Sequence, residues 1–445
     1  MLPVDILRAQ LEQGDFDREL SLIHSGSRLK KSGNRLERLL KRMAETFSPQ
    51  KAGIASAPGR TEMGGNHTDH NHGRVLAAAI NLDCLAVFSE ANSSDKDTVT
   101  ILSENYERPI IVNLSDTSPR EEEKETSEAI VRGVADGFRR SGFKISGFNA
   151  CVSSTIPAGT GLSSSAAFEV LVGRIFNHLF NNSSIGPLDI ARIAKRAENI
   201  HFGKPCGFMD QMACSFEGIL SIDFKNPDNP GIKRVTPGFG QHDCTNDFYG
   251  TGYRLCVLNT GGSHADLTPD YAAIPSEMTA AANSLGHTEA RGITTAEVLD
   301  NIDIIRKQAG DRALLRLFHF IGEDERAVLQ AEALLSGDMT GFLRLVEESG
   351  NSSSHLLQNC YSTTDPSAQP IPLALHLTGL LLDSKGVARI HGGGFAGTIQ
   401  AYVHESCFDK YRRTMEKIFG TGSLIELMIR QPGHEFLTAG PKAGR

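Results

Sequence analysis

The sequence predicts a mixed α and β protein with at least two domains. Runs rich in β-branched and aromatic residues alternate with stretches of helical periodicity, and 445 residues are enough for two or three separate cores. Residues 228–251 are rich in Gly, Pro, Asn and Asp, a composition typical of a linker. We therefore expect an N-terminal extension over residues 1–48, one domain over 49–228 and a second over 229–445.

The composition excludes several classes of function. A net charge of −8 and an isoelectric point near 6.0 argue against a nucleic-acid or anionic membrane surface. No apolar run approaches the roughly 20 residues of a membrane span, and the first stretch is too charged for a signal peptide. The eight cysteines form no C-x-x-C pair and are expected to be reduced, buried thiols. We expect a cytoplasmic, monomeric protein that binds small molecules.

Residues 1–47 have helical periodicity. One apolar stripe contains Leu7, Leu11 and Phe16, and another contains Leu36, Leu39, Leu40 and Met43. The pattern favours a solvated helical hairpin packed on the body over an arm that binds a partner.

A polar stretch punctuated by glycine runs from Ala55 into an apolar strand at residues 75–80, and loops at strand ends often carry function. His67, Asp69, His70 and His72 suggest a metal site. In an extended segment, however, the first two share one face and the last two share the other, so the four do not converge without a special turn. Asn, His and Asp side chains suit sugar hydroxyls better, because each supplies directional donors or acceptors.

Strands are expected at residues 82–88, 98–102 and 109–114. The acidic run at 121–125 then opens a helix that continues to Phe138, where the negative charges favour the helix N-terminus.

The segment Pro157–Ala167 lies between a β-branched run at 152–156 and a helical pattern at 168–179, so it predicts strand, glycine loop and helix. Glycines allow backbone N–H groups to approach an anion, and the first helical turn adds free N–H donors and a positive dipole end. The loop is not a Walker A loop, because no Lys-Ser or Lys-Thr pair closes it. Phosphate binding is favoured over a flexible Ser/Gly linker.

The next helical pattern covers residues 188–202 and places Glu198 near its C-terminal end, where a carboxylate is unfavourable without a cation. The segment 203–211 interrupts the pattern, which restarts at Met212. Asp210 falls at this restart, and a helix N-cap and a catalytic role are equally compatible with its position.

The second half begins with a strand at 253–258, followed by a polar loop at 259–264. Helical patterns follow at 274–285, 295–309, 323–335 and 339–349. A glycine run at 391–397 joins strands at 387–390 and 398–403. It fits a β-bulge and a second backbone anion site equally well.

Four segments match known motifs in order and at comparable spacing: Pro58–Asp69, Pro157–Ala167, Pro205–Gln211 and Arg389–Gly397. The family patterns are G-R-x-N-L-I-G-E-H-T-D-Y-N, G-L-S-S-S-A, P-C-G-x-M-D-Q and G-G-G-F-G-G. Over about its last 390 residues the chain therefore resembles the galactokinase branch of the GHMP small-molecule kinases. This resemblance implies an α+β fold in two domains, with the active site in the cleft between them.

The resemblance also implies an ATP- and magnesium-dependent kinase that phosphorylates the anomeric hydroxyl of galactose. Asp210 matches the base, and Arg60 matches the cation that keeps it ionised. Ser165 and Glu198 match magnesium ligands. The ATP phosphates would be held by Gly159, Thr160, Gly161, Leu162, Ser163, Ser164 and Ser165, and the sugar by Asn66, His67, Asp69 and Tyr271.

The sequence departs from the family in its sugar-recognition residues. Asn66 replaces the glutamate that contacts the sugar near C6, His70 replaces a tyrosine, Ala396 replaces a glycine, and the arginine expected soon after Tyr271 is absent. Loss of a carboxylate beside C6 removes a like-charge penalty against an acidic sugar. The alternatives to galactose are therefore galacturonate or another C6-modified galactose, and a catalytically silent sugar sensor.

Overall fold

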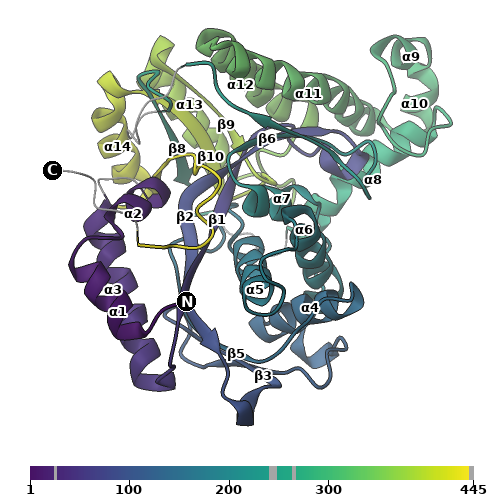
Figure 1. The fold of residues 1–445 in the computed structure, drawn as a ribbon. Coiled ribbons are helices and arrows are strands. Elements are labelled where there is room, and N and C mark those ends of the chain that lie inside the picture. The colour runs from purple at the N-terminus through teal and green to yellow at the C-terminus, as the bar shows by residue number, and fades with distance from the viewer. Residues whose placement is uncertain (25–27, 240–247, 263–266, 440–445) are drawn as a thin grey trace.

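The computed structural model of the chain describes residues 1–24, 28–239, 248–262 and 267–439. Within these ranges the strands form two sheets (Figure 1). The first has the order β4-β3-β5-β2-β6-β7, with β1 also paired to β2, and only β3 and β5 run parallel. Its strands are β1 Gly53–Gly64, β2 Arg74–Glu90, β3 Thr98–Ser103, β4 Ile110–Asn113, β5 Phe148–Ser154, β6 Ile219–Asp223 and β7 Gly231–Val235.

The second sheet is antiparallel, in the order β11-β8-β10-β9. Its strands are β8 Tyr253–Asn259, β9 Gly386–His391, β10 Thr398–His404 and β11 Leu424–Leu427. Strand β7 lies beyond the boundary predicted at 228/229 but pairs with β6 of the first sheet. One apolar core also contains residues of both sheets, such as Ala86 and Val257. The predicted division into domains stays a prediction.

Strand β2 is the centre of the first sheet. Residues 75–80 and 82–88, predicted as two strands, belong to this single 17-residue strand. Asn81 and Asp83 broke the apolar pattern, but both are buried and bonded: Asn81 Oδ1 accepts from Met428 N at 2.9 Å. Because side chains alternate along a strand, Leu85 lies in the apolar cluster that contains Leu36 and Leu40, whereas Ala86 lies in the cluster that contains Val134 and Val170.

Four helices cover one face of the first sheet: α4 Ser127–Arg140, α5 Ser164–Phe180, α6 Pro187–Arg196 and α7 Met209–Phe216 (Figure 1). The helix predicted over 121–138 is divided, with a 3₁₀ turn at Glu121–Glu123 and a restart after Thr126. Thr126 caps α4, since its hydroxyl accepts a hydrogen bond from Ala129 N.

The N-terminal extension forms three helices, α1 Val4–Glu12, α2 Asp17–His24 and α3 Leu29–Phe47, on the opposite face of the sheet (Figure 1). It is bound by more than its apolar stripes. His24 and Arg35 reach Asp83 at 3.0 and 2.6 Å, and all three side chains are buried. The basic side of α3 is therefore solvated only in part.

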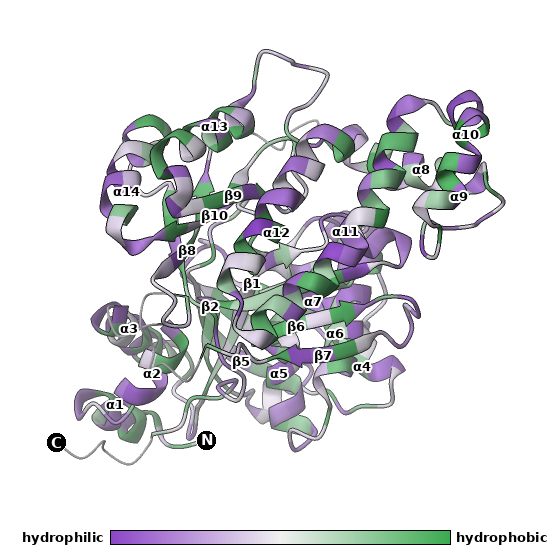
Figure 2. Ribbon diagram, turned by 90° about the horizontal axis from the view of Figure 1, so that it is seen from above, coloured by the Kyte–Doolittle hydropathy of each residue, from purple (hydrophilic) through white to green (hydrophobic). Residues whose placement is uncertain are grey.

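Within the described ranges, seven further α-helices follow: α8 Thr268–Asn283, α9 Thr295–Asp300, α10 Ile302–Gln308, α11 Asp311–Ser336, α12 Met339–Ser352, α13 Pro370–Leu382 and α14 Glu405–Phe419. Helices α8, α9 and α10 stand apart from the two sheets in Figure 2. Together with α11 they have their own apolar cluster, which includes Phe395 and Ala396 of the β9–β10 loop. That loop therefore has a packed layer behind it.

Two further expectations concern the membrane and the cysteines. No helix among the described residues is long and apolar enough to cross a membrane. Cys84, Cys151, Cys206, Cys214, Cys256, Cys360 and Cys407 are free thiols, as predicted, and Cys244 lies outside the described residues. The prediction that they are buried is wrong for Cys206 and Cys407, which are half-buried.

Candidate active site

The centre of the site is an ion pair between Arg60 of β1 and Asp210 of α7. Arg60 Nε lies 2.7 Å from Asp210 Oδ1, and the Arg60 side chain is only 7% exposed. Burial opposes ionisation of the carboxyl, but the Arg60 charge and hydrogen bonds from Arg60 and Ser163 hold the pKa of Asp210 below its ordinary value. Asp210 is therefore a carboxylate at neutral pH, able to orient a hydroxyl or accept its proton.

The first half of the polar stretch is a strand rather than a loop. Residues 53–64 form β1, and its register against β2 shifts between Pro58 and Arg60. Such a β-bulge bends the strand and redirects a side chain. Gly59 is required here, because a Cβ at this position would lie 2.6 Å from the Leu162 carbonyl oxygen of the phosphate loop.

Asp210 is not a helix cap. The N-cap of α7 is Phe208, and Asp210 is the second residue of the helix. Its carboxylate instead accepts a hydrogen bond from the Ser163 hydroxyl at 2.5 Å. A carboxylate in the first turn is further stabilised by the helix dipole. Of the two roles compatible with its position in the sequence, the structure leaves Asp210 free for the catalytic one.

The glycine loop has the geometry expected of an anion cradle. Gly159 and Gly161 have φ values of 70° and 66°, and Ser163 lies in the left-handed region at φ 60°. The carbonyls of Gly161 and Leu162 accept hydrogen bonds from the Arg60 side chain and backbone N–H. The N–H groups of Gly161, Leu162 and Ser163 donate to no partner among the described residues.

Helix α5 begins at Ser164 immediately after this loop, and its N-cap makes no side-chain capping bond because the Ser163 hydroxyl is directed to Asp210. Free N–H groups and the positive end of a helix dipole together form an anion site. The predicted phosphate loop therefore has N–H donors available to bind an anion.

Ser165 and Glu198 lie together, as the resemblance implies. Ser165 Oγ is 3.0 Å from Glu198 Oε1. Oxygens on adjacent octahedral corners, each about 2.1 Å from Mg²⁺, lie roughly 3 Å apart, so this pair fits two magnesium ligands. Among the described residues no group of three or more His, Cys, Asp and Glu side chains is arranged to hold a metal.

The backbone around Glu198 differs from the prediction of one helix over 188–202. Helix α6 ends at Arg196, and residues Ala197–Phe202 form a π-helical turn. The extra residue in such a turn redirects the following side chains, and π-turns are frequent at functional sites. Glu198 is 2% exposed, and Lys204 Nζ lies 3.5 Å from its Oε1.

Two residues beside Glu198 were not predicted. The Gln211 amide donates to Glu198 Oε2 at 2.7 Å and to Glu169 Oε2 at 3.2 Å, so it bridges two buried carboxyl groups. Burial and the neighbouring Glu198 raise the pKa of Glu169 well above its ordinary value. Sequence spacing contained a signal for Glu169, since it follows Ser165 by four residues and so shares its helix face.

The predicted sugar residues gather around two glycines. A Cβ at Gly207 would lie 2.0 Å from Asp69 Oδ2, and one at Gly393 would lie 2.5 Å from the Tyr271 ring. His67 Nε2 donates to the Gly393 carbonyl at 2.9 Å, and burial lowers the pKa of His67 to about 4. The neutral ring keeps its Nδ1 as an acceptor for a hydroxyl.

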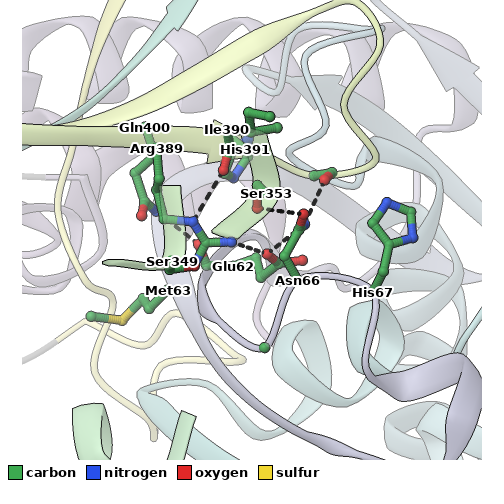
Figure 3. A network of polar contacts seen from close by, with 12 residues as sticks. Glu62, Met63, Asn66, His67, Ser349, Ser353, Arg389, Ile390, His391 and Gln400 are labelled. Carbon is green, nitrogen blue, oxygen red and sulfur yellow. Dashed lines mark hydrogen bonds and ion pairs between the residues drawn. The ribbon is translucent and has the colours of Figure 1, made fainter. Parts of the chain in front are cut away.

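Asn66 has a different environment from His67. Its Nδ2 donates to Glu62 Oε1 at 3.0 Å and to the Gly392 carbonyl at 2.8 Å, and its Oδ1 accepts from Asn359 and Ser353. In Figure 3 the Asn66 side chain lies within this network, and the His67 ring lies to one side of it. All hydrogen-bonding positions of the Asn66 amide are thus used within the protein, and its contact with sugar stays a prediction.

The network also contains a carboxylate. Glu62 forms a buried ion pair with Arg389 of β9 (Figure 3). The acidic group absent from position 66 is therefore present at position 62, in direct hydrogen-bond contact with Asn66. The β9–β10 loop is a hairpin with intact register from His391 to Thr398, not a bulge.

Two family models match the chain. The description of the first is "GHMP kinases N terminal domain", and it matches residues 129–218, which include the phosphate loop and Asp210. The second is "Galactokinase galactose-binding signature", and it matches residues 42–90, which include Arg60 and the predicted sugar residues Asn66, His67 and Asp69 in the loop after β1.

Whole-chain relatives agree with these matches. A galactokinase of Streptomyces coelicolor is 28% identical over 387 residues, which are 86% of this chain and 92% of that protein. A galactokinase of Clostridium acetobutylicum is 28% identical over 82% of this chain and 88% of that protein. The crystal structure of Lactococcus lactis galactokinase with galactose superposes with a TM-score of 0.73 at 22% identity, covering 87% of this chain and 96% of that one. This last likeness confirms the predicted α+β fold, whereas the position of the site in a cleft between two domains stays a prediction.

Proposed function

The chain is a GHMP kinase of the galactokinase branch, and from this premise we propose that it transfers the γ-phosphoryl group of ATP to the anomeric hydroxyl of galactose. The oxygen of that hydroxyl forms a bond to the γ-phosphorus, the bond from phosphorus to the β–γ bridging oxygen breaks, and galactose 1-phosphate and ADP result. The hydroxyl proton passes to the Asp210 carboxylate.

The observation that carries the proposal is the hydrogen-bonded set Arg60–Asp210–Ser163 beside the open loop. Phosphoryl transfer depends mainly on positioning and on neutralising charge. Asp210 lies where two helix N-termini meet, one its own and one belonging to α5. A sugar hydroxyl held at Asp210 is thereby placed next to the N–H groups that would receive the phosphates of ATP.

Arg60 serves both partners of the reaction. Its guanidinium binds Asp210 and the carbonyl of Gly161 in the phosphate loop. It keeps the base ionised and supplies positive charge close to the transferring group. Arginine suits this position because its planar fork supplies several fixed donors.

Ser165 and Glu198 are the residues that would hold Mg²⁺, which supplies charge neutralisation on the ATP phosphates when bound. Gln211 fixes the orientation of the Glu198 carboxylate by donating to it.

Galactose is favoured over an acidic sugar. The galactokinases that resemble the chain over more than 80% of its length support this choice. The Glu62 carboxylate next to Asn66 does not bear on it, because Arg389 neutralises its charge. His67, Asp69 and Tyr271 supply neutral and acidic partners for sugar hydroxyls. The monomeric state and the cytoplasmic location stay predictions.

The test is ADP release by the purified protein with ATP, Mg²⁺ and a panel of free sugars that includes galactose, galacturonate, N-acetylgalactosamine, arabinose and fucose. We expect the highest kcat/KM for galactose, and a phosphorus NMR spectrum of the product that identifies a 1-phosphate. Preference for galacturonate would overturn the substrate assignment, and the variant Asn66→Glu would then be expected to improve the use of galactose.

Absence of turnover with every sugar would favour the sensor alternative. The matched variant Asp210→Asn separates the two cases, because a kinase loses its ADP release in this variant, whereas a sensor releases no ADP with or without the base. Binding of galactose by the inactive variant, measured by calorimetry, confirms that its site is intact.

A further inference from the structure

His391 at the end of β9 joins the strand that carries Arg60 to the phosphate loop. The residue is 2% exposed, and both ring nitrogens are bonded. Nε2 lies 3.0 Å from Thr61 Oγ1 of β1, and Nδ1 lies 3.0 Å from Thr398 Oγ1 of β10. Thr398 Oγ1 in turn donates to the Thr160 carbonyl of the phosphate loop at 3.1 Å.

The bond from Thr398 to Thr160 selects one consistent direction for each hydrogen bond in this series. Thr398 uses its only hydroxyl hydrogen on Thr160, so His391 Nδ1 must be the donor to Thr398. A neutral ring then has an acceptor at Nε2, which receives the Thr61 hydroxyl hydrogen. Thr61 Oγ1 accepts from Gln400 Nε2 at 2.7 Å, which completes a single series of donors and acceptors.

The charges around the ring are consistent with its neutral form. Burial, together with the nearby Arg60 and Arg389 charges, lowers the pKa of His391 well below its ordinary value, against opposing contributions from Asp210 and from the backbone of Thr160. A proton on Nε2 of His391 would point at the hydroxyl hydrogen of Thr61, so two donors would face each other. The geometry and the charges thus select the same tautomer.

We propose that His391 is a positioning residue for the phosphate loop, acting through Thr398. The proposal rests on the proposed kinase function. Arg60 holds the carbonyls of Gly161 and Leu162, whereas the His391–Thr398 relay holds that of Thr160. Three successive carbonyls are thereby fixed, and the loop N–H groups keep a constant direction toward the nucleotide.

The relay assigns a role to the second sheet. His391 and Thr398 are the paired residues at the two ends of the β9–β10 hairpin, and Gly393 of the same hairpin contacts the sugar residues His67 and Tyr271. One hairpin thus contacts both substrate sites. The relay is its connection to the nucleotide, and the glycine turn is its connection to the sugar.

The test uses Thr398→Val, which removes the hydroxyl at nearly constant volume, and Thr398→Ser, which keeps it. Binding of a non-hydrolysable ATP analogue with Mg²⁺ is measured by calorimetry, and galactose KM and kcat by ADP release. We expect nucleotide affinity to fall about tenfold in Thr398→Val, with galactose KM within twofold of the wild-type value and recovery in Thr398→Ser.

Thr378→Val is the matched control. Thr378 is also a buried threonine whose hydroxyl donates to a carbonyl, that of Ala374, but it lies in α13. The nucleotide affinity of Thr378→Val is expected to stay unchanged, while its thermal unfolding midpoint falls about as much as that of Thr398→Val. Equal loss of nucleotide affinity in this control would assign the effect to general destabilisation and refute the relay.

A double-mutant cycle tests whether His391 acts through Thr398. His391→Leu should weaken nucleotide binding, and addition of Thr398→Val should weaken it no further. Additive losses, unchanged affinity in folded Thr398→Val, or parallel loss of galactose and nucleotide would each overturn the proposal. A wild-type chain that binds no nucleotide would instead refute the proposed function itself. If His391→Leu does not fold, the comparison of Thr398→Val with Thr398→Ser and Thr378→Val still tests the proposal.

Discussion

Substitution of Gly207 by alanine should damage sugar recognition without damaging the fold. An added Cβ would lie 2.0 Å from Asp69 Oδ2, whereas contacts to a real Cβ essentially never fall below 3.0 Å, so the oxygen must withdraw by at least about 1 Å. Gly207 does not have a left-handed φ, and alanine is therefore compatible with its backbone. The end of the Asp69 side chain can rotate, and the displacement is confined to the carboxylate.

The size of the effect follows from the interaction that is lost. A hydrogen bond to a charged group contributes about 1.5–3 kcal/mol, which corresponds to a loss of roughly 10- to 150-fold in kcat/KM for galactose. The KM for ATP should stay within twofold of the wild-type value, because the carbonyls of the phosphate loop are held by Arg60 and Thr398. Steady-state kinetics with each substrate varied in turn give both values.

Gly379→Ala is the control for this substitution. Gly379 is an exposed residue within α13, and an added Cβ would meet nothing within 4 Å. We expect unchanged kinetics and slightly higher stability, since alanine favours the helix by about 1 kcal/mol. If Gly207→Ala kept the galactose kcat/KM of the wild type, or raised the KM for ATP equally, Asp69 would not be a sugar ligand.

Three further predictions concern catalysis, the metal and stability. Asp210→Asn should lower kcat by about 10²- to 10⁴-fold with little change in galactose affinity, as measured by ADP release and calorimetry; a fall of less than tenfold would remove Asp210 as the base. Ser165→Ala should raise the Mg²⁺ concentration needed for half-maximal activity and leave galactose binding nearly unchanged, whereas equal loss of both would contradict the assigned role. Burial disfavours ionised Asp83, but Arg35 and His24 hold its pKa well below the ordinary value. Its contribution to the free energy of unfolding is therefore complete above about pH 4 and lost as the pH falls toward the lowered pKa. Asp83→Asn should cost about 3–5 kcal/mol in denaturant unfolding at pH 7 and flatten this acid dependence, and an unchanged dependence would contradict the pairing.

Local patterns in the sequence were sufficient to predict the geometry of the glycine loop. An apolar strand, a glycine-rich turn and a helical period at 168–179 all lie within one short segment, so local chemistry determines the geometry. The structure places β5, the turn and α5 accordingly. Resemblance then supplied Asp210 and Arg60, which lie 150 residues apart and which local periodicity does not connect.

Strand β1 was missed because its composition is that of a loop. Pro58, Gly59 and Gly64 lie within a strand that is buried on nearly every residue. Glycine is present where other backbone or side chains approach closely, and the proline lies next to the register shift. Tertiary packing therefore overrode the local propensity.

Residues that act through distant partners could not be predicted at all. His391 is bonded to Thr61 of β1, and the Arg389 side chain is paired with Glu62. No local pattern near either residue indicates a partner more than 300 positions away. The length of β2 was hidden for the same reason, since Asn81 and Asp83 are bonded by residues from opposite ends of the chain.

The pairing of β2 has a consequence for synthesis of the protein. Ala79 and Asn81 complete their backbone hydrogen bonds with Arg430 and Met428, residues near the end of the chain. At roughly 5–20 residues per second, a ribosome needs tens of seconds to deliver these partners after β2 has emerged. Until then the central strand of the first sheet has unpaired backbone groups, and late, long-range closure of this kind slows folding. A truncation that removes Met428 and Arg430 would therefore leave backbone groups of the central strand β2 without their hydrogen-bond partners.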